Sequence, residues 1–489
     1  MSDNTMKSVR SESFSERTFA EIAVLHDGRE GGPRSGAKMI RRGILLAVLA
    51  ANAGCVGDNR VESSRPTILL LSLDTVRADR VGSPRGLTPA LDRLASGARV
   101  FANARSPAPF TLPAMASVMT GLYPHAAGIG NHSRQDRLRP DAPTLAELAR
   151  RGGYETAAVV TNPWLTSEEA GFARGFDRFS SGRSRGASRS RMMAEEVVSE
   201  SLSLFHEARN RPLLLWLHFM DAHMPYGDAL SDSAIRRDFA GGPAERSRLF
   251  FRAPYDPAEV RATVRAYDAA VAKIDAALSP LLAAVGDDAI VIVLADHGES
   301  LGEHGLHFAH DFTVYDELLR VPLLVRAPGL APGRSFAPVS LIDVLPTLCA
   351  LADLECPGGL AGIALPIGEN VSDGERLERT LFAASAPMRQ RYDCPWLTVP
   401  GLEGRWTAAL FGDRKLIRVP TAKGPRYHAF DLRADPAETV DRFDLLLDAQ
   451  RVPTLDEWTR NAMPSRPVTT RSEPRDEVTR ELEELGYLD

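Results

Sequence analysis

Apolar residues along the chain gather in short continuous runs that alternate with stretches of helical periodicity. The apolar runs lie at 67–73, 156–161, 213–219, 289–295 and 321–326, and the helical patterns lie at about 88–97, 143–152, 192–208 and 257–285. A strand that is apolar at every position is covered on both faces. This alternation predicts an α/β fold with a mostly parallel central sheet and helices on both faces.

The pattern changes beyond about residue 370. The apolar runs become shorter there, around 405–419 and 427–432, and a closing helix is expected at about 474–485. We therefore expect a main domain over 67–370 and a smaller C-terminal α+β subdomain over 371–489. Residues 180–191, rich in Ser, Gly and Arg, are typical of a mobile surface loop, and 228–254 suggest an insertion near the mouth of a site.

The N-terminal segment has the features of an export signal. A basic stretch from Met39 to Arg42 precedes an apolar run, 43–51, that is about half as long as a membrane-spanning helix. Ala53-Gly54-Cys55 then resembles a bacterial lipobox, although Asn52 replaces the usual Leu. We expect 39–55 to be a signal peptide ending at a lipidated Cys55, and the protein to be an exported lipoprotein, tethered to a membrane in the periplasm or at the cell surface.

The segments on either side of the expected signal peptide are polar. Residues 1–38 are polar and charged, so we interpret them as a disordered extension whose translation is in doubt, since Met39 could be the true start. Residues 56–66 are a linker. We expect membrane contact only through the N-terminal lipid anchor.

Composition adds little to this interpretation. With 44% hydrophobic residues, 25% charged residues and a net charge of -6, the chain is an ordinary globular protein with no sign of nucleic-acid binding. Four cysteines, Cys55, Cys349, Cys356 and Cys394, are too few for a disulfide framework and lack zinc-finger spacing. Cys349 and Cys356 could pair in an oxidising compartment or stay as thiols. The sequence does not indicate the oligomeric state.

Polar residues that end two of the apolar runs are candidates for chemistry. Asp74 follows the run 67–73, and Asp296 and His297 follow the run 289–295. Ligands of open α/β sheets bind beyond the carboxyl ends of the strands. Together with Thr111, these residues suggest a metal site that activates an alcohol. Asp74 or Thr111 could instead only cap a helix.

Several blocks, taken in order, resemble the sulfatase family of the alkaline phosphatase superfamily. They are Leu73–Arg80, Thr88–Ala95, Thr111–Pro124, Leu217–Tyr226, Ala295–Gly305, His310–Leu323 and Asp343–Thr347. The resemblance extends from about Thr67 to Leu488 and implies the sulfatase fold. With Asp296, His297 and Gly298, the chain is similar to the family members that carry an Asp-His-Gly sequence at the matching place.

The resemblance implies roles for the matched residues. Asp74, Asp296 and His297 would hold one divalent cation, with Thr111 completing or facing its shell. Oxygen ligands with an imidazole suit Mn²⁺, Zn²⁺ or Mg²⁺, and Ca²⁺ is less natural.

Four further residues receive roles in substrate binding or proton transfer. His223 and His310 would contact the substrate anion or protonate the leaving group, unless either histidine is structural. Lys415 would add a cation to the substrate site or lie at the surface. Arg77 would contact substrate or brace the first loop.

The chain departs from the family at the nucleophile. Sulfatases carry Cys or Ser in a Cys/Ser-x-Pro-x-Arg motif, and that residue becomes formylglycine, whereas this chain has Thr111 and, at the Arg position, Met115. Thr75 also replaces a second ligating Asp. A sulfated threonine must be attacked at sulfur, which is slow, but a phosphorylated threonine can be attacked at phosphorus. This difference favours phosphate or phosphonate esters.

We therefore expect a metal-dependent hydrolase of sulfate or phosphate esters, with Thr111 as the metal-activated nucleophile. Its substrate would be a small molecule, a glycan or a lipid ester. One alternative is a phosphotransferase acting on cell-envelope glycans or lipids. Another is a catalytically inactive sulfatase-like binding protein, against which the retention of Asp74, Thr111, Asp296 and His297 argues.

Overall fold

The computed structural model describes residues 65–130, 136–182, 191–208, 211–226, 233–240, 250, 255–367, 379–386, 404–446 and 451–462. Several predicted features lie outside this part of the chain. They are the signal segment with Cys55, most of 180–191, most of 228–254, Cys394 and the helix expected at 474–485.

The central sheet is mixed but mostly parallel, as predicted. Its spatial order is β11 (Gly333–Ser335), β2 (Arg99–Phe101), β10 (Leu323–Arg326), β7 (Ile290–Leu294), β1 (Ile68–Leu73), β6 (Leu213–Phe219), β4 (Glu155–Val160) and β5 (Arg178–Ser180). The five strands from β7 to β5 are parallel, whereas β10 is antiparallel to both of its neighbours. Every residue of β1, β6 and β7 is buried, so these three strands form the middle of the core.

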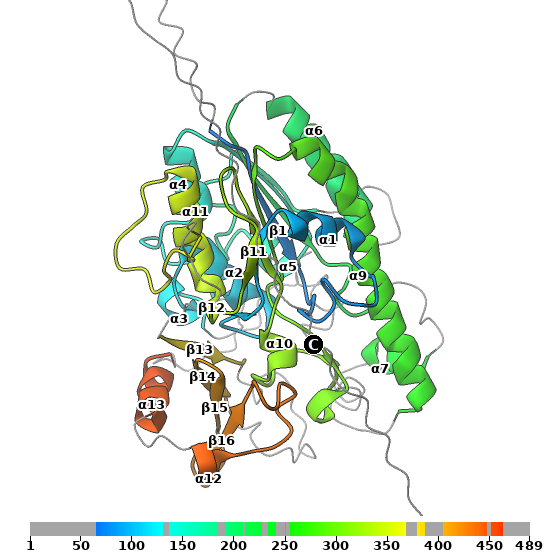
Figure 1. Cartoon of the computed structure of the whole chain (residues 1–489), viewed down its shortest axis with the longest axis vertical. Helices are drawn as coiled ribbons and strands as arrows, with labels where there is room; N and C mark the ends of the chain where they lie inside the picture. The colour runs from blue at the N-terminus through cyan, green and yellow to red at the C-terminus, as the bar shows by residue number, and fades with distance from the viewer. Residues whose placement is uncertain are drawn as a thin grey trace, which may run out of the picture. The chain divides into compact units, whose positions relative to one another are not determined.

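Helices cover both faces of this sheet (Figure 1). One face carries α1 (Pro89–Ser96), α6 (Ala194–Ala208) and the long α9 (Pro257–Val285). The other carries α2 (Thr111–Thr120), α4 (Leu145–Arg151) and α11 (Val344–Ala352). Shorter helices complete the main domain: α3 (Pro124–Ala127), α5 (Pro163–Thr166), α7 (Ala234–Ala240), α10 (Asp316–Leu319), η2 (Glu303–Gly305) and η3 (Leu341–Asp343).

Local sequence explains where several helices begin. Thr144 and Glu147 form a reciprocal capping box before α4, and Asp256 accepts a hydrogen bond from a backbone N–H of α9, whose first residue is Pro257. Two short ribbons join the loops: β3 (Ala104–Arg105) pairs with β12 (Val339–Ser340), and β8 (Ser300–Leu301) pairs with β9 (His307–Ala309).

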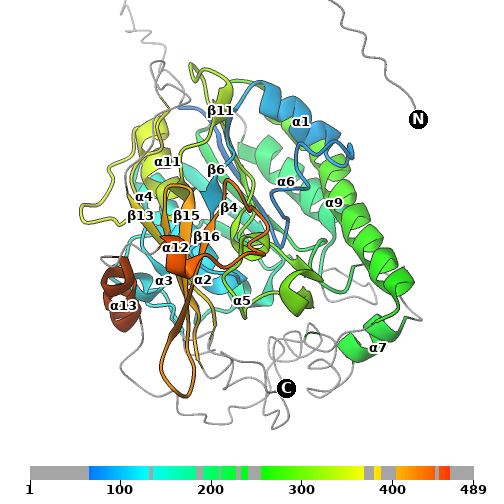
Figure 2. The ribbon, with the colours of Figure 1, turned by 60° about the horizontal axis from the view of Figure 1, so that its bottom comes forward.

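A second sheet follows in the C-terminal region (Figure 2). It is antiparallel, with the order β13 (Thr380–Ala384), β14 (Thr407–Phe411), β15 (Arg414–Val419) and β16 (Arg426–Asp431). Residues alternate between two faces: Ala408 and Ile417 pack with Leu319 of α10, whereas Leu416 packs with Leu455 of α13. The helices here are α12 (Phe443–Leu446) and α13 (Arg451–Ala462). The shift to short β-rich runs thus marks a separate sheet.

Two further observations bear on the sequence analysis. Within the described residues, no helix is both long enough and apolar enough to cross a membrane. Cys349 and Cys356 are both free; Cys349 is buried and Cys356 is exposed. The structure therefore has thiols at these positions.

Candidate metal and nucleophile site

Four adjacent parallel strands each deliver a polar residue to the carboxyl edge of the central sheet. In the order β7, β1, β6 and β4, these are Asp296, Asp74, His218 and Asn162. The register pairs Ser72 of β1 with His218 of β6, so the end of β1 lies beside this imidazole. The topology therefore gathers residues that are far apart along the chain.

Two carboxylates and two imidazoles form the centre of the site. Ligand atoms of Asp74, His218 and Asp296 all lie within 4.8 Å of one another. His297 Nε2 is 3.6 Å from Asp74 Oδ1 and 3.6 Å from Asp296 Oδ2. All four side chains are fully buried.

The donor atoms of this cluster fit a divalent cation. Within the described part of the chain, Asp74 Oδ1, Asp296 Oδ2 and His218 Nε2 accept or donate no hydrogen bond. Buried polar atoms without partners are rare, and a bound ion is one explanation for them. Carboxylate oxygens with imidazole nitrogens suit Mn²⁺ or Zn²⁺ well.

The protonation behaviour of the cluster points the same way. Burial, together with the nearby Asp296, raises the pKa of Asp74 to about 7, and burial raises the pKa of Asp296 to about 7. Burial lowers the pKa of His218 to about 3 and, with His310 nearby, the pKa of His297 to about 4. The imidazoles are therefore neutral, as metal ligands must be, and a cation would stabilise the two carboxylates in their charged form.

Thr111 places its hydroxyl against this cluster. Thr111 Oγ1 lies 3.4 Å from Asp74 Oδ2 and 3.3 Å from His297 Nε2, and the residue is 2% exposed. Thr111 is the first residue of α2, and Phe110, not Thr111, occupies the N-cap position. The alternative that Thr111 is only a capping residue is therefore wrong. The positive end of the helix dipole lies at this hydroxyl and favours negative charge on it.

Asn162 bridges the nucleophile candidate and the carboxylate. Its Nδ2 donates to Asp74 Oδ2 at 2.8 Å and to Thr111 Oγ1 at 3.2 Å. Its Oδ1 accepts from the backbone N–H of Trp164 at 3.0 Å, which caps α5. The cap fixes the amide orientation, because only the nitrogen can then face Thr111.

Thr75 follows Asp74 in a strained conformation. Its φ is 61°, in the left-handed region that a β-branched residue rarely adopts. The strain is compensated, since Thr75 Oγ1 donates to Ala222 O at 2.7 Å and Thr75 N donates to Asp296 Oδ1 at 3.3 Å. This turn brings Asp74 and Asp296 together and rules out the alternative that Asp74 merely caps a helix. Because the Thr75 hydroxyl already donates to a backbone carbonyl oxygen, it does not serve as a metal ligand in place of the second Asp.

His223 and His310 lie next to the cluster, as predicted. The His310 ring centroid is 4.5 Å from that of His297 and 5.0 Å from that of His223. His310 Nδ1 is 3.1 Å from Glu299 Oε1. Although burial alone would lower the pKa of His310, the carboxylates of Asp311 and Glu299 raise it to about 9.

His223 has the opposite protonation tendency. Burial and then the neighbouring His310 hold the pKa of His223 well below its usual value. His223 Nδ1 lies 2.6 Å from its neighbour's carbonyl, Met224 O. At neutral pH the two histidines therefore differ in charge, which separates a proton donor from a neutral partner.

The two residues predicted to bind substrate lie elsewhere. Lys415 is 1% exposed, and its Nζ is 2.9 Å from both Asp316 Oδ1 and Glu438 Oε1. Arg77 pairs with Asp79 at 3.0 Å and with Glu303 at 2.7 Å. Arg77 thus braces the first loop, and Lys415 joins β15 to α10. The structure brings neither side chain to Thr111, because buried carboxylates hold one and loop carboxylates hold the other.

Sequence reasoning missed two residues of the site. His218 belongs to a block that carries the family resemblance, but no role was assigned to it; its signal is that it is the one polar residue of the run Leu213–Phe219. Asn162 follows the apolar strand β4, as Asp74 follows β1. A polar residue just after a central strand was therefore a sequence signal for a residue of the site.

Comparisons with known proteins identify the family of this chain. The family model described as Sulfatase matches residues 66–354. The chain is 22% identical to a Delta 4,5-hexuronate-2-O-sulfatase of Bacteroides thetaiotaomicron, over 84% of this chain and 92% of the relative. It is 24% identical to a choline-sulfatase of Rhizobium meliloti, over 78% and 82% of the two chains.

A solved structure shares the fold. The phosphonate monoester hydrolase of Silicibacter pomeroyi superposes with a TM-score of 0.61 at 19% identity, over 81% of this chain and 94% of that chain. Both sulfatases and phosphonate monoester hydrolases are thus among the proteins that this chain resembles.

Proposed function

The chain belongs to the sulfatase family of ester hydrolases, and we propose that Thr111 is its nucleophile and that phosphate or phosphonate esters are its preferred substrates. One observation carries the proposal. The Thr111 hydroxyl lies within hydrogen-bond distance of Asp74, His297 and Asn162 at the start of α2.

The residues present supply the parts of a displacement reaction. Asp74, Asp296, His297 and His218 would hold a divalent cation, which when bound lowers the pKa of a nearby hydroxyl and neutralises anionic ester oxygens. Thr111 Oγ1, which donates toward Asp74 Oδ2, attacks phosphorus as its proton passes to that carboxylate. Asn162 Nδ2 donates to the oxygen as negative charge develops there.

His310 would complete the first step. With a pKa near 9 it carries a proton at neutral pH, and that proton can pass to the alcohol oxygen as the phosphorus–oxygen bond of the ester breaks. Water then attacks the phosphorus of the modified Thr111 and gives its proton to the now neutral His310. The bond between phosphorus and Thr111 Oγ1 breaks, the proton on Asp74 returns to that oxygen, and phosphate or phosphonate is released. A sulfated threonine would have to be attacked at sulfur in the same step, which is why we favour phosphorus.

The proposal is tested with the full chain loaded in turn with Mn²⁺, Zn²⁺, Mg²⁺ or Ca²⁺. Turnover of an aryl sulfate, an aryl phosphate monoester, a phosphodiester and an aryl phosphonate is compared. Thr111→Ala should lower kcat by about a thousandfold or more, whereas Thr120→Ala, in the same helix, should not. Mass spectrometry should detect a phosphothreonine at 111 after rapid quenching.

Three outcomes would change the assignment. Undiminished activity in Thr111→Ala would remove Thr111 from the mechanism. Fast aryl-sulfate turnover that requires Thr111 would overturn the preference for phosphorus. Transfer of the phosphoryl group to an added alcohol in preference to water would identify a phosphotransferase.

We also propose that the protein is exported as a lipoprotein. The basic and apolar stretches before Ala53-Gly54-Cys55 support this. In cells fed labelled palmitate, the wild-type chain should be labelled and sediment with membranes. Cys55→Ala should lose the label, and an unlabelled wild-type chain would overturn this proposal.

A further inference from the structure

The antiparallel ribbon of β8 and β9 places Glu299 opposite His310, the proton donor of the proposed reaction. Ser300 pairs with Ala309 in this ribbon, so the next facing positions are Glu299 and His310. His310 Nδ1 lies 3.1 Å from Glu299 Oε1, and the Glu299 side chain is fully buried. No step of the proposed reaction uses this carboxylate, so its contact with the proton donor has a role still to be assigned.

Tyr226 holds the other oxygen of the Glu299 carboxylate. Its hydroxyl donates to Glu299 Oε2 at 3.0 Å, and the tyrosine is 2% exposed. The Tyr226 ring packs edge-on against Tyr267 and Phe308, with centroid distances of 5.4 and 6.2 Å. Packing therefore fixes the ring, and the hydroxyl of the ring fixes the carboxylate that contacts His310.

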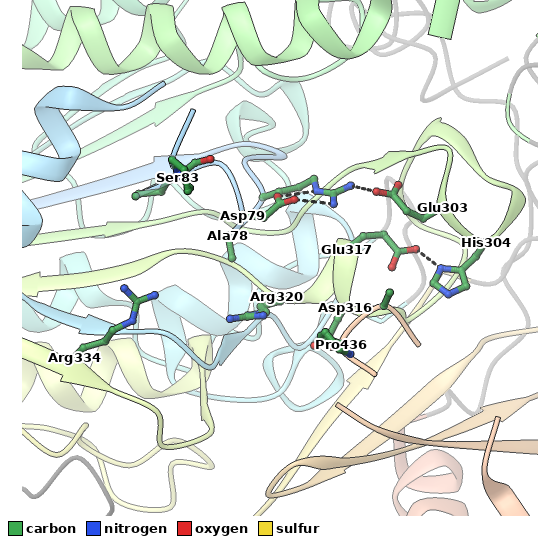
Figure 3. A pocket seen from close by; sticks show the side chains of 15 residues that line it. Ala78, Asp79, Ser83, Glu303, His304, Asp316, Glu317, Arg320, Arg334 and Pro436 are labelled. Carbon is green, nitrogen blue, oxygen red and sulfur yellow. Dashed lines mark hydrogen bonds and ion pairs between the residues drawn. The ribbon is translucent and has the colours of Figure 1, made fainter. Parts of the chain in front are cut away.

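The main chain of Glu299 is anchored as well. Arg77 donates to the Glu299 carbonyl oxygen at 3.2 Å. Arg77 also lines a cavity of about 490 Å³, together with Asp79 and Glu303, its two carboxylate partners (Figure 3). Glu299 is thus fixed at its carbonyl oxygen and at both carboxylate oxygens.

This arrangement decides which imidazole nitrogen of His310 transfers a proton. The hydrogen bond that one ring nitrogen makes determines the protonation of the other. A carboxylate oxygen only accepts, so Nδ1 is the donor to Glu299 and the proton on Nε2 is the one that can be transferred. Asp311 Oδ1 lies 3.7 Å from Nε2, which is beyond hydrogen-bond distance.

We propose that Glu299, held by Tyr226, is a positioning residue that directs His310 Nε2 at the leaving oxygen of the ester. The Nε2 proton passes to that oxygen as its bond to phosphorus breaks, and the Nδ1 proton stays on the ring, bonded to Glu299. Nε2 of the neutral ring can then accept the proton of the attacking water. The proposal rests on the role proposed for His310, but not on the identity of the nucleophile.

The test compares two esters of one acid that differ only in the leaving group. The p-nitrophenolate anion leaves without a proton, whereas phenolate is a stronger base and leaves faster when an acid protonates it. The value of kcat/KM is measured with the metal-loaded full chain, on the ester class that the wild type turns over, sulfate esters included. Glu299→Gln should lower it by about a hundredfold for the phenyl ester and by less than about threefold for the p-nitrophenyl ester. Tyr226→Phe, which removes only a hydroxyl, should show the same selectivity with a loss of about tenfold.

A matched control and a double variant separate positioning from general damage. Tyr267→Phe also removes a buried hydroxyl, but one that donates to Thr75 O, at 2.8 Å, and it should keep the wild-type ratio of the two rates. His310→Gln should show the selective loss of Glu299→Gln. Adding Glu299→Gln to His310→Gln should cost nothing further with the phenyl ester, because residues that act as a unit are not additive.

A spectroscopic measurement does not depend on turnover. A strong hydrogen bond from an imidazole N–H to a carboxylate moves its proton resonance to low field. In the Zn²⁺-loaded wild type, one such resonance should be present that is absent from both His310→Gln and Glu299→Gln.

Three results would overturn the proposal. They are equal losses for the two esters in Glu299→Gln, a further loss in the double variant, and a low-field resonance that persists in Glu299→Gln. Failure of the proposed function appears elsewhere: full activity of Thr111→Ala removes the nucleophile but leaves these ratios as expected. If the wild type turned over no ester, the resonance would still decide whether Glu299 holds His310.

Discussion

At the scale of single residues, the site is a set of buried polar side chains that serve as hydrogen-bond or charge partners for one another. Asp74 contacts Asn162, His218, His297 and Thr111. Each partner changes how charge is shared between the carboxylate and the hydroxyl. Asn162, one of the two site residues that were not predicted from the sequence, contacts both groups.

Asn162 therefore offers a sharp test of how the nucleophile is positioned. Asn162→Ala should lower kcat by about a hundredfold, since it removes the N–H that donates to Thr111 Oγ1. Asn162→Ser keeps an oxygen for the Trp164 N–H, so its stability should match the wild type while its kcat still falls. Equal kcat in Asn162→Ser and wild type would show that the amide only caps α5.

The pKa of His310 predicts how kcat changes on the alkaline side of the pH profile. Its pKa is raised to about 9, so the proton donor is present below that value and lost above it. The kcat of the metal-loaded enzyme should therefore fall as pH rises through about 9. His310→Gln should be slower and should lack this decline. A profile with the same alkaline decline in His310→Gln would assign the titration to another group.

At the scale of elements, parallel strand order and helix starts create the site. The carboxyl ends of β7, β1, β6 and β4 meet at one edge of the sheet, and α2 begins at Thr111. Gly298 allows α10 to approach this edge, because a Cβ there would lie 2.0 Å from Glu317 O. The second sheet is then joined to α10 through a buried ion-pair cluster.

That cluster makes a prediction about stability. Lys415 contacts Asp316 and Glu438 with its side chain fully buried. Lys415→Met should lower the free energy of unfolding by about 3 kcal/mol, because the two buried carboxylates lose their cation. Arg414→Ala, at the exposed neighbouring position, should change it by less than about 0.5 kcal/mol. Urea denaturation measures both. If Lys415→Met were as stable as the wild type, Asp316 and Glu438 would not need the lysine as their partner.

At the scale of the whole molecule, the metal site couples folding to pH. Asp74 and Asp296 have folded-state pKa values near 7, above the ordinary value of 3.8. Groups of this kind favour folding below their unfolded pKa, and that stability is lost as pH rises through the folded pKa. A divalent cation reverses the preference, because it binds the charged form.

Thermal unfolding should show both effects. In EDTA, the Tm should fall between about pH 4 and 7, and Asp296→Asn should reduce this fall. At pH 7.5, Mn²⁺ or Zn²⁺ should raise the Tm of the wild type by several degrees and leave that of Asp296→Asn nearly unchanged. An equal metal-dependent rise in both proteins would place the cation elsewhere.

Much of the fold was predictable from the sequence. The apolar runs identified β1, β4, β6, β7 and β10, and helical periodicity located α1, α4, α6 and α9, because burial on both faces or on one stripe leaves a local signature. The short outer strands β11, β2 and β5 were not predicted, since three-residue segments carry no periodicity.

The sequence by itself determined the central strands, the family and the chemical types of Asp74, Thr111, Asp296 and His297, since each follows a recognisable local pattern. Only the tertiary structure decided which side chains meet. It added His218 and Asn162 to the site, and it gave Lys415 and Arg77 partners away from Thr111. The physical reason is that contacts across a sheet depend on strand order, and strand order is a property of long-range packing that leaves no trace in local periodicity.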